Sequence, residues 1–112
     1  AEDFRAIGKV QSCSLSQIPS KHYDLILHAT STALRNNELV LPTEIIGPQT
    51  HCYDLSYSDS TTPFMRWAKA HGATNIVDGF GMLLEQAAES FYLWHDKRPD
   101  TAMVYSYLRP KP

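Results

Sequence analysis

The sequence is poor in the features that mark several large classes of protein. It has no apolar run of membrane-spanning length, and its first residues lack the basic and apolar regions of a signal peptide. Its ten Lys and Arg residues are scattered among twelve Asp and Glu residues, for a net charge of −2. That balance gives no electrostatic footprint for nucleic acid or an anionic membrane. These absences predict a cytoplasmic protein with neither nucleic acid nor a membrane as its partner.

Cysteine, histidine and glycine patterns are equally sparse. Cys13 and Cys52 are far apart and have no metal-binding spacing, which predicts two reduced thiols. The five histidines form no His-x-x-x-His or His-Glu-x-x-His motif, so no metal site is expected. Residues 79–81 (GFG) lack the third glycine of a dinucleotide-binding fingerprint. Motif spacing alone therefore leaves the function open.

What the sequence does contain is an alternation of strand and helix patterns. Residues 23–29 form a nearly continuous apolar run, which predicts a strand covered on both faces of a parallel sheet. Residues 51–57 predict a second strand, residues 75–78 a short strand or loop, and residues 10–15 a further short strand. Residues 34–47 suit a surface excursion with a helical turn before Pro48.

Three helices are expected between and after these strands. Thr62 and Pro63 supply an N-cap hydroxyl and a first-turn proline, and Gly72 a stop. Gly79 opens a long helix, and a last short helix starts at residues 99–100. The long helix carries apolar residues at helical spacing: Phe80, Leu83, Leu84, Ala87, Phe91 and Trp94. The order of elements predicts an α/β domain with a parallel sheet and flanking helices.

Ligands of open parallel sheets bind outside the carboxyl ends of the strands, and three places there could carry chemistry. Residues 29–32 (ATST) form a small hydroxyl-rich cluster, for which a plain polar turn is the more common interpretation. Leu55 and Tyr57 share one face at the end of the second strand, although Tyr57 could simply pack. Residues 79, 82 and 86 share a helix face, on which Gln86 could bind a polyhydroxylated ligand or only be solvated.

Four ordered segments together carry a resemblance to a known family. They are residues 23–31 (YDLILHATS), 53–57 (YDLSY), 62–64 (TPF) and 78–88 (DGFGMLLEQAA). In this order and spacing, the chain resembles the C-terminal part of shikimate dehydrogenases over nearly its whole length. The resemblance implies an incomplete Rossmann-like three-layer domain, in which residues 1–112 form the C-terminal part of an NADP-binding domain with its C-terminal helices. The N-terminal substrate and catalytic domain would precede a start that lacks Met.

The family's reaction is the reversible, NADP-dependent reduction of 3-dehydroshikimate to shikimate by hydride transfer, in aromatic amino-acid (chorismate) biosynthesis. The resemblance implies that Thr30, Ser31, Leu55 and Gly79 contact NADP. It likewise implies that Tyr57 and Gln86 bind shikimate or 3-dehydroshikimate. No residue of this chain is expected to be catalytic, because the family's catalytic Lys and Asp, its glycine-rich phosphate loop and its Asn-Arg-Thr element have no counterpart here. The isolated chain is expected to be inactive.

The sequence departs from the family pattern at a few positions. His28 stands where the family usually has Asn, Leu55 where it has Met, and Ala33 or its neighbour where it has Gly. Leu55 keeps an apolar platform, so little loss is expected there. The imidazole of His28 presents different hydrogen-bond donors from an amide, which leaves the cofactor preference open. A quinate/shikimate dehydrogenase relative and a stand-alone nucleotide-binding or interaction module are the alternatives. A truncated domain is also expected to expose an apolar face and self-associate.

Overall fold

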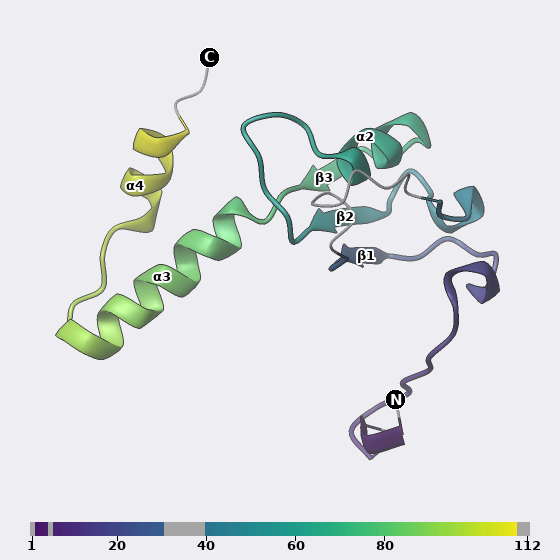
Figure 1. Ribbon diagram of the computed structural model, residues 1–112, viewed down its shortest axis with the longest axis horizontal. Coiled ribbons are helices and arrows are strands. Elements are labelled where there is room, and N and C mark those ends of the chain that lie inside the picture. The colour runs from purple at the N-terminus through teal and green to yellow at the C-terminus, as the bar shows by residue number, and fades with distance from the viewer. Residues whose placement is uncertain (1, 5, 31–39, 110–112) are drawn as a thin grey trace.

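The computed structural model describes residues 2–4, 6–30 and 40–109 and shows a small parallel sheet with helices around it (Figure 1). The strands are β1 (Leu25–His28), β2 (His51–Asp54) and β3 (Asn75–Val77), and the α-helices are α2 (Pro63–Ala70), α3 (Phe80–His95) and α4 (Thr101–Leu108). Three short 3-10 helices are η1 (Glu2–Phe4), η2 (Leu15–Gln17) and η3 (Thr43–Ile45). Over the described residues, none of these helices has the length and apolar character needed to span a membrane.

The three strands form one sheet in the order β1-β2-β3, and both pairings are parallel. Cys52 in the central strand lies opposite Ile26 on one side and Ile76 on the other. The prediction of an α/β fold with a parallel sheet and flanking helices is therefore confirmed. The helical turn expected before Pro48 is also present, as η3. The surface excursion expected around it is wrong for Ile45 and Ile46, which are buried in the core, and residues 34–39 lie outside the described residues.

Helix α2 forms as its sequence predicts. Thr62 is the N-cap, and its Oγ1 accepts a hydrogen bond from the Met65 N–H at 3.2 Å. Pro63 occupies the first turn, where its missing N–H costs nothing. Gly72 then adopts a φ of 94°, which only glycine reaches without strain, and ends the helix.

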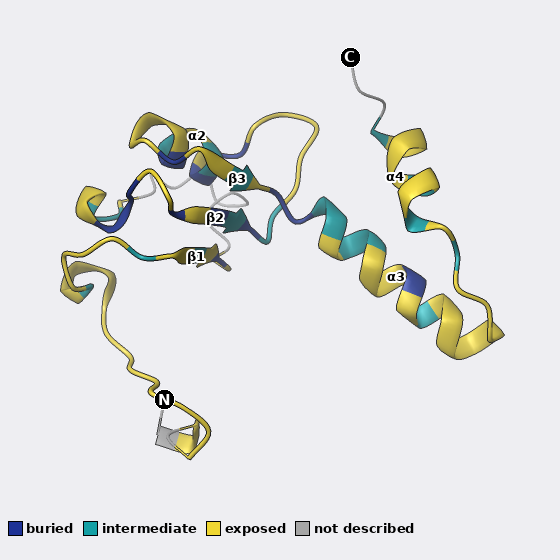
Figure 2. Ribbon diagram, turned by 180° about the vertical axis from the view of Figure 1, so that it is seen from behind, coloured by how far each residue is buried: buried dark blue, intermediate teal, exposed yellow. Residues whose placement is uncertain are grey.

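Helix α2 covers one face of the sheet and builds the core there. Phe64 and Ala68 of α2 are buried with Cys52 of β2, and the other buried members of this core cluster are Ile45, Ile46 and Ala73. The opposite face is different, since Leu25, Leu27 and Val77 are 54%, 60% and 53% exposed. The expectation that the first strand is covered on both faces is therefore wrong for the described residues, because α3 and α4 lie beyond the end of the sheet (Figures 1 and 2).

Helix α3 leaves the sheet and is partnered by α4 rather than by a strand (Figure 1). Asp100 is the N-cap of α4, and its carboxylate accepts a hydrogen bond from the Met103 N–H at 3.1 Å. The helix start predicted at residues 99–100 is therefore confirmed. Only part of the apolar stripe predicted for α3 is covered. Phe91 and Trp94 in its last turns are 43% and 78% exposed. Helix α4 instead contacts the start of α3, where the Tyr105 ring lies 5.4 Å from that of Phe80.

The segment before β1 does not form the short strand predicted over residues 10–15. Residues 9–14 have no regular secondary structure, and η2 begins at Leu15. A strand needs a neighbouring strand to satisfy its backbone groups, and this segment lies away from the sheet with its side chains exposed (Figure 2). Modest alternation was therefore a misleading signal here.

Candidate functional site at the carboxyl edge of the sheet

The segments that follow the three strands are joined by backbone hydrogen bonds. The Leu55 N–H, just after β2, donates to the His28 carbonyl at the end of β1, at 2.9 Å. The Gly79 N–H, just after β3, donates to the Ser56 carbonyl at 3.0 Å. The residues that leave the sheet at this edge therefore form one connected surface, where open parallel sheets bind their ligands.

Gly79 is needed at its position because the backbone of Leu55 lies against it. A Cβ atom added to Gly79 would lie 2.6 Å from the Leu55 carbonyl carbon and closer still to its oxygen. Its φ of −76° is open to any residue, so the constraint is space and not backbone strain. Glycine thus lets the start of α3 approach the end of β2, which brings the predicted residues Leu55 and Gly79 together.

A buried polar network lies beneath this surface. His28 Nδ1 is 3.0 Å from Asp54 Oδ1, and both side chains are buried, at 5% and 0% exposure. Asp54 Oδ1 also accepts from the Ser56 N–H at 3.0 Å, and Asp54 Oδ2 accepts from the Thr62 hydroxyl. A buried carboxylate needs such partners, and Asp54 has them on both oxygens.

The same network reaches the predicted cofactor-side residue Thr30. His28 Nε2 lies 2.7 Å from Thr30 Oγ1, and the imidazole stacks on Phe64 with 4.6 Å between ring centroids. If the Nδ1–H of a neutral imidazole donates to Asp54, Nε2 is left to accept from the Thr30 hydroxyl. Asp54 and His28 thus fix the hydroxyl of Thr30, which is exposed, while Ser31 lies outside the described residues.

The sequence predicted neither Asp54 nor Thr62 as a member of this network, and it indicated no metal-binding motif among the histidines. The parallel register pairs His28 directly with Asp54. A histidine and an aspartate at the ends of two apolar strands were the signal available in the sequence. What it could not supply was the register that places them opposite each other.

Two predicted substrate-side residues, Tyr57 and Gln86, are placed differently. Tyr57 is 52% exposed, and its ring lies 6.0 Å from that of Phe80, which opens α3 beside Gly79. Gln86 is exposed on α3, seven residues after Gly79, which is about 10 Å along the helix axis. Tyr57 therefore belongs to the surface around Gly79, whereas Gln86 extends it along α3.

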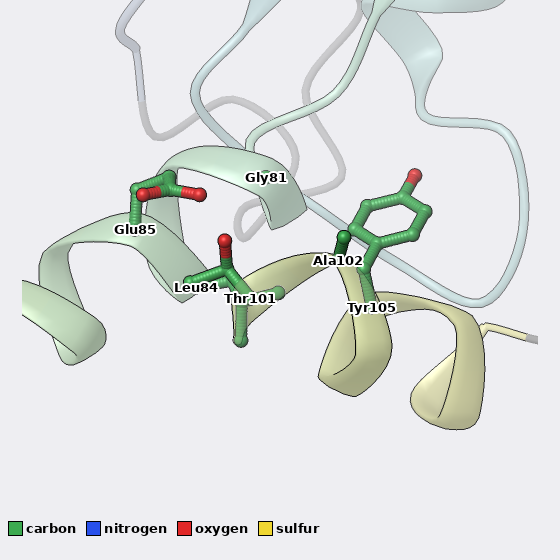
Figure 3. Close-up of a pocket in the computed structure, with 6 residues that line it drawn as sticks. All are labelled: Gly81, Leu84, Glu85, Thr101, Ala102 and Tyr105. Carbon is green, nitrogen blue, oxygen red and sulfur yellow. The ribbon is translucent and has the colours of Figure 1, made fainter. Parts of the chain in front are cut away.

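Two hollows are lined by residues next to the candidate site. One, of about 420 Å³, lies between α3 and α4 and is lined by Gly81, Leu84, Glu85, Thr101, Ala102 and Tyr105 (Figure 3). The other, of about 350 Å³, is lined by residues 58–61, Met65, Asp78 and Arg109. Within the part of the chain that the structure describes, no cluster of three or more His, Cys, Asp or Glu side chains could hold a metal ion.

Comparison with known proteins identifies the relatives of this chain. The model of the shikimate 5'-dehydrogenase C-terminal domain matches residues 79–105. A shikimate dehydrogenase (NADP(+)) of Alkalilimnicola ehrlichii is 48% identical over 110 residues, and one of Psychromonas ingrahamii is 42% identical over 106 residues. The chain matches the C-terminal part of the shikimate dehydrogenases. The alignments cover 98% and 95% of this chain but only 40% and 39% of those two shikimate dehydrogenases, so the chain spans about two fifths of their length.

Solved structures agree with this similarity. An enzyme from Pseudomonas putida is 35% identical with a TM-score of 0.75, over 87% of this chain and 36% of its own. A shikimate dehydrogenase from Aquifex aeolicus is 25% identical with a TM-score of 0.64, over 77% and 32%. A shikimate 5-dehydrogenase from Thermus thermophilus in complex with shikimate is 31% identical with a TM-score of 0.58, over 74% and 30%. The Rossmann-like character expected of the fold is thereby confirmed.

Proposed function

We propose that the protein containing this chain is an NADP-dependent shikimate dehydrogenase, which reversibly reduces 3-dehydroshikimate to shikimate by hydride transfer. In this proposal, residues 1–112 are the C-terminal part of its NADP-binding domain, and the catalytic residues lie elsewhere in the protein. The observation that supports it most is the contact of Gly79 with the Leu55 backbone, which gathers residues of separate family-like segments at one edge of the sheet.

The residues at this edge suit one end of a dinucleotide. Leu55 is partly exposed and apolar, as a platform for a flat ring requires, and the Thr30 hydroxyl is held by His28. Gly79 lets the start of α3 lie against the Leu55 backbone, which keeps the first turn of α3 beside this platform. Thr30, Leu55 and Gly79 would therefore hold the nicotinamide side of NADP(H), which when bound supplies or accepts the hydride. Ser31, which lies outside the described residues, is assigned to the same group by the family resemblance alone.

Tyr57 and Gln86 would bind the substrate by hydrogen bonds. The Tyr57 hydroxyl both donates and accepts, as does the Gln86 amide, and shikimate carries several hydroxyl groups and a carboxylate. Their contribution is to position the substrate. Correct placement of two reacting groups lowers the activation barrier by several kcal/mol, as in well-oriented intramolecular reactions.

The proposal assigns proton transfer and pyrophosphate binding to other parts of the protein. The sequence has no glycine-rich phosphate loop after a strand. Isolated residues 1–112 should therefore not catalyse the reaction. The uncovered Leu25, Leu27 and Val77 face should also promote self-association of the isolated chain.

A steady-state assay of the full-length protein tests the proposal. NADP+-dependent oxidation of shikimate, with quinate and NAD+ as alternative substrates, should give the highest kcat/KM for shikimate with NADP+. A preference for quinate or NAD+ would point to a related dehydrogenase, and no oxidation with any pair would overturn the proposal.

A further inference from the structure

We propose that Arg109, at the end of α4, is a positioning residue that holds the Tyr57 segment against the start of α3. Arg109 is far from Tyr57 and Gly79 in sequence, and it lies outside the segments that carry the family resemblance. The inference rests on the proposed function, because it concerns how the substrate-side residue Tyr57 is held.

The Arg109 guanidinium joins two segments of the candidate site. Its Nη1 donates to Asp78 Oδ2 at 2.6 Å, and its Nη2 donates to the Ser58 carbonyl at 2.8 Å. Asp78 precedes Gly79, and Ser58 follows Tyr57. One side chain from the end of α4 therefore bridges the residues next to both Gly79 and Tyr57.

Aromatic contacts reinforce the bridge. The guanidinium carbon of Arg109 lies 4.4 Å from the centroid of the Phe80 ring, a cation–π distance. The Phe80 ring also contacts Tyr57 at 6.0 Å and Tyr105 of α4 at 5.4 Å between centroids. Phe80 is thus packed between the Tyr57 segment and α4, and Arg109 lies over it.

The Asp78 carboxylate is suited to this role. The Asp78 side chain is 11% exposed, its Oδ1 accepts from the Phe80 N–H at 3.2 Å, and its Oδ2 accepts from Arg109. The hydrogen bond that Arg109 donates to Asp78 raises the pKa of Arg109 above its ordinary value. Only a planar guanidinium offers two terminal nitrogens fixed at the spacing needed to reach two acceptors, so lysine could keep one contact but not both.

Arg98 provides a matched control. It also bridges two acceptors, the carboxylates of Glu85 and Glu89, but on the exposed outer turns of α3. R98K removes a two-acceptor arginine of the C-terminal region without touching the Tyr57 segment. A difference between R109K and R98K therefore reports the position of the arginine and not the loss of a guanidinium.

The test compares wild type, R109K, R109M, D78N and R98K in the full-length protein. R109K and R109M should raise the KM for shikimate about tenfold with a smaller change in kcat, whereas a loss of folded protein alone would lower apparent kcat at constant KM. D78N should resemble R109K, and R98K should resemble wild type. R109K kinetics indistinguishable from R98K would overturn the inference.

Amide hydrogen exchange on the same proteins separates this inference from the proposed function. Exchange in residues 55–61 and 79–83 should accelerate in R109K and D78N but not in R98K. If the wild type fails to oxidise shikimate, the proposed function fails, and the exchange result still decides whether Arg109 holds these segments. Unchanged exchange in both R109K and D78N would overturn the inference regardless of activity.

Discussion

Gly79 and Leu55 lie 24 residues apart in sequence, yet the start of α3 packs so closely on the end of β2 that Gly79 has no room for a Cβ atom beside the Leu55 carbonyl. The contact joins the chain after β3 to the chain after β2. It places the apolar Leu55 side chain beside the start of α3, at the edge of the sheet where we propose that NADP binds.

Replacing Gly79 by alanine should disturb this contact. The overlap is with backbone, which cannot rotate away, so G79A should lower the free energy of unfolding by about 1–3 kcal/mol, the usual cost of overpacking. Denaturant unfolding measures this loss. Under the proposed function, the KM of the full-length protein for NADP+ should also rise.

Gly81 is the matched control for that substitution. A Cβ atom there would meet nothing within 4 Å, and the residue lies inside α3. G81A should therefore stabilise the protein by up to about 1 kcal/mol through helix propensity. Equal stability changes in G79A and G81A would contradict the steric account.

Asp54 should be the most sensitive polar residue of the network. D54A would leave the His28 imidazole, the Thr62 hydroxyl and the Ser56 N–H without their buried acceptor. The expected loss of stability is about 3–5 kcal/mol, because each buried donor left without an acceptor costs about 1–3 kcal/mol. D59A, on the exposed 58–61 loop, should change stability by less than about 0.5 kcal/mol. A D54A loss as small as that of D59A would mean that the buried network contributes little.

Thr62 has two roles that a pair of substitutions can measure. T62A removes both the N-cap of α2 and a donor to Asp54, and should cost about 1–2 kcal/mol of stability. T62S keeps a hydroxyl in place and should recover most of that loss in thermal unfolding. Failure of T62S to recover would assign the effect to the missing methyl group.

The two cysteines should react at different rates with a thiol reagent. Cys13 is exposed, whereas Cys52 is buried beneath α2, and burial raises the pKa of its thiol. The reactive thiolate is therefore suppressed at Cys52 in the folded protein. C13S and C52S measured singly should show fast labelling of Cys13, and labelling of Cys52 only on unfolding.

The raised pKa of Cys52 determines how its contribution to the free energy of unfolding changes with pH. A thiol whose folded pKa is raised stays protonated while the unfolded chain already loses its proton. The stabilising contribution of Cys52 is thus complete below the unfolded pKa and declines as pH rises above it. C52A should weaken the alkaline loss of stability relative to wild type.

The uncovered sheet face should drive association of the isolated chain. Leu27 is 60% exposed beside Leu25 on β1, so L27E should reduce concentration-dependent association without a large loss of stability. Val40 is also exposed but lies outside the sheet, and V40E serves as the control. If light scattering showed that both variants associate as the wild type does, this face would be excluded as the site of association.

The sequence predicted most of the local structure because its signals are local. Thr62, Pro63 and Gly72 define α2 by capping chemistry, and the apolar runs define β1 and β2. The exposure of one face of the sheet was not predictable from the strand sequences. It depends on where the helices pack, and the strand residues alone do not determine that. The strand expected at residues 10–15 failed for the same reason, since alternation does not guarantee a neighbouring strand.

The candidate site was predicted in parts. Leu55, Tyr57 and Gly79 do meet at one edge, because parallel strands bring their carboxyl ends together. The pairing of His28 with Asp54 needed the strand register, and the reach of Arg109 across 51 residues to Ser58 needed the packing of α4. Long-range side-chain contacts of this kind leave no periodic trace in the sequence.

Shikimate oxidation with NADP+, measured by NADPH formation for residues 1–112 alone, the full-length protein and its Y57F variant, tests the central claim most directly. The account predicts no turnover by residues 1–112, turnover by the full-length protein, and a raised KM for shikimate in Y57F with little change in the KM for NADP+. Turnover by residues 1–112 alone, or a Y57F enzyme with an unchanged KM for shikimate, would contradict it.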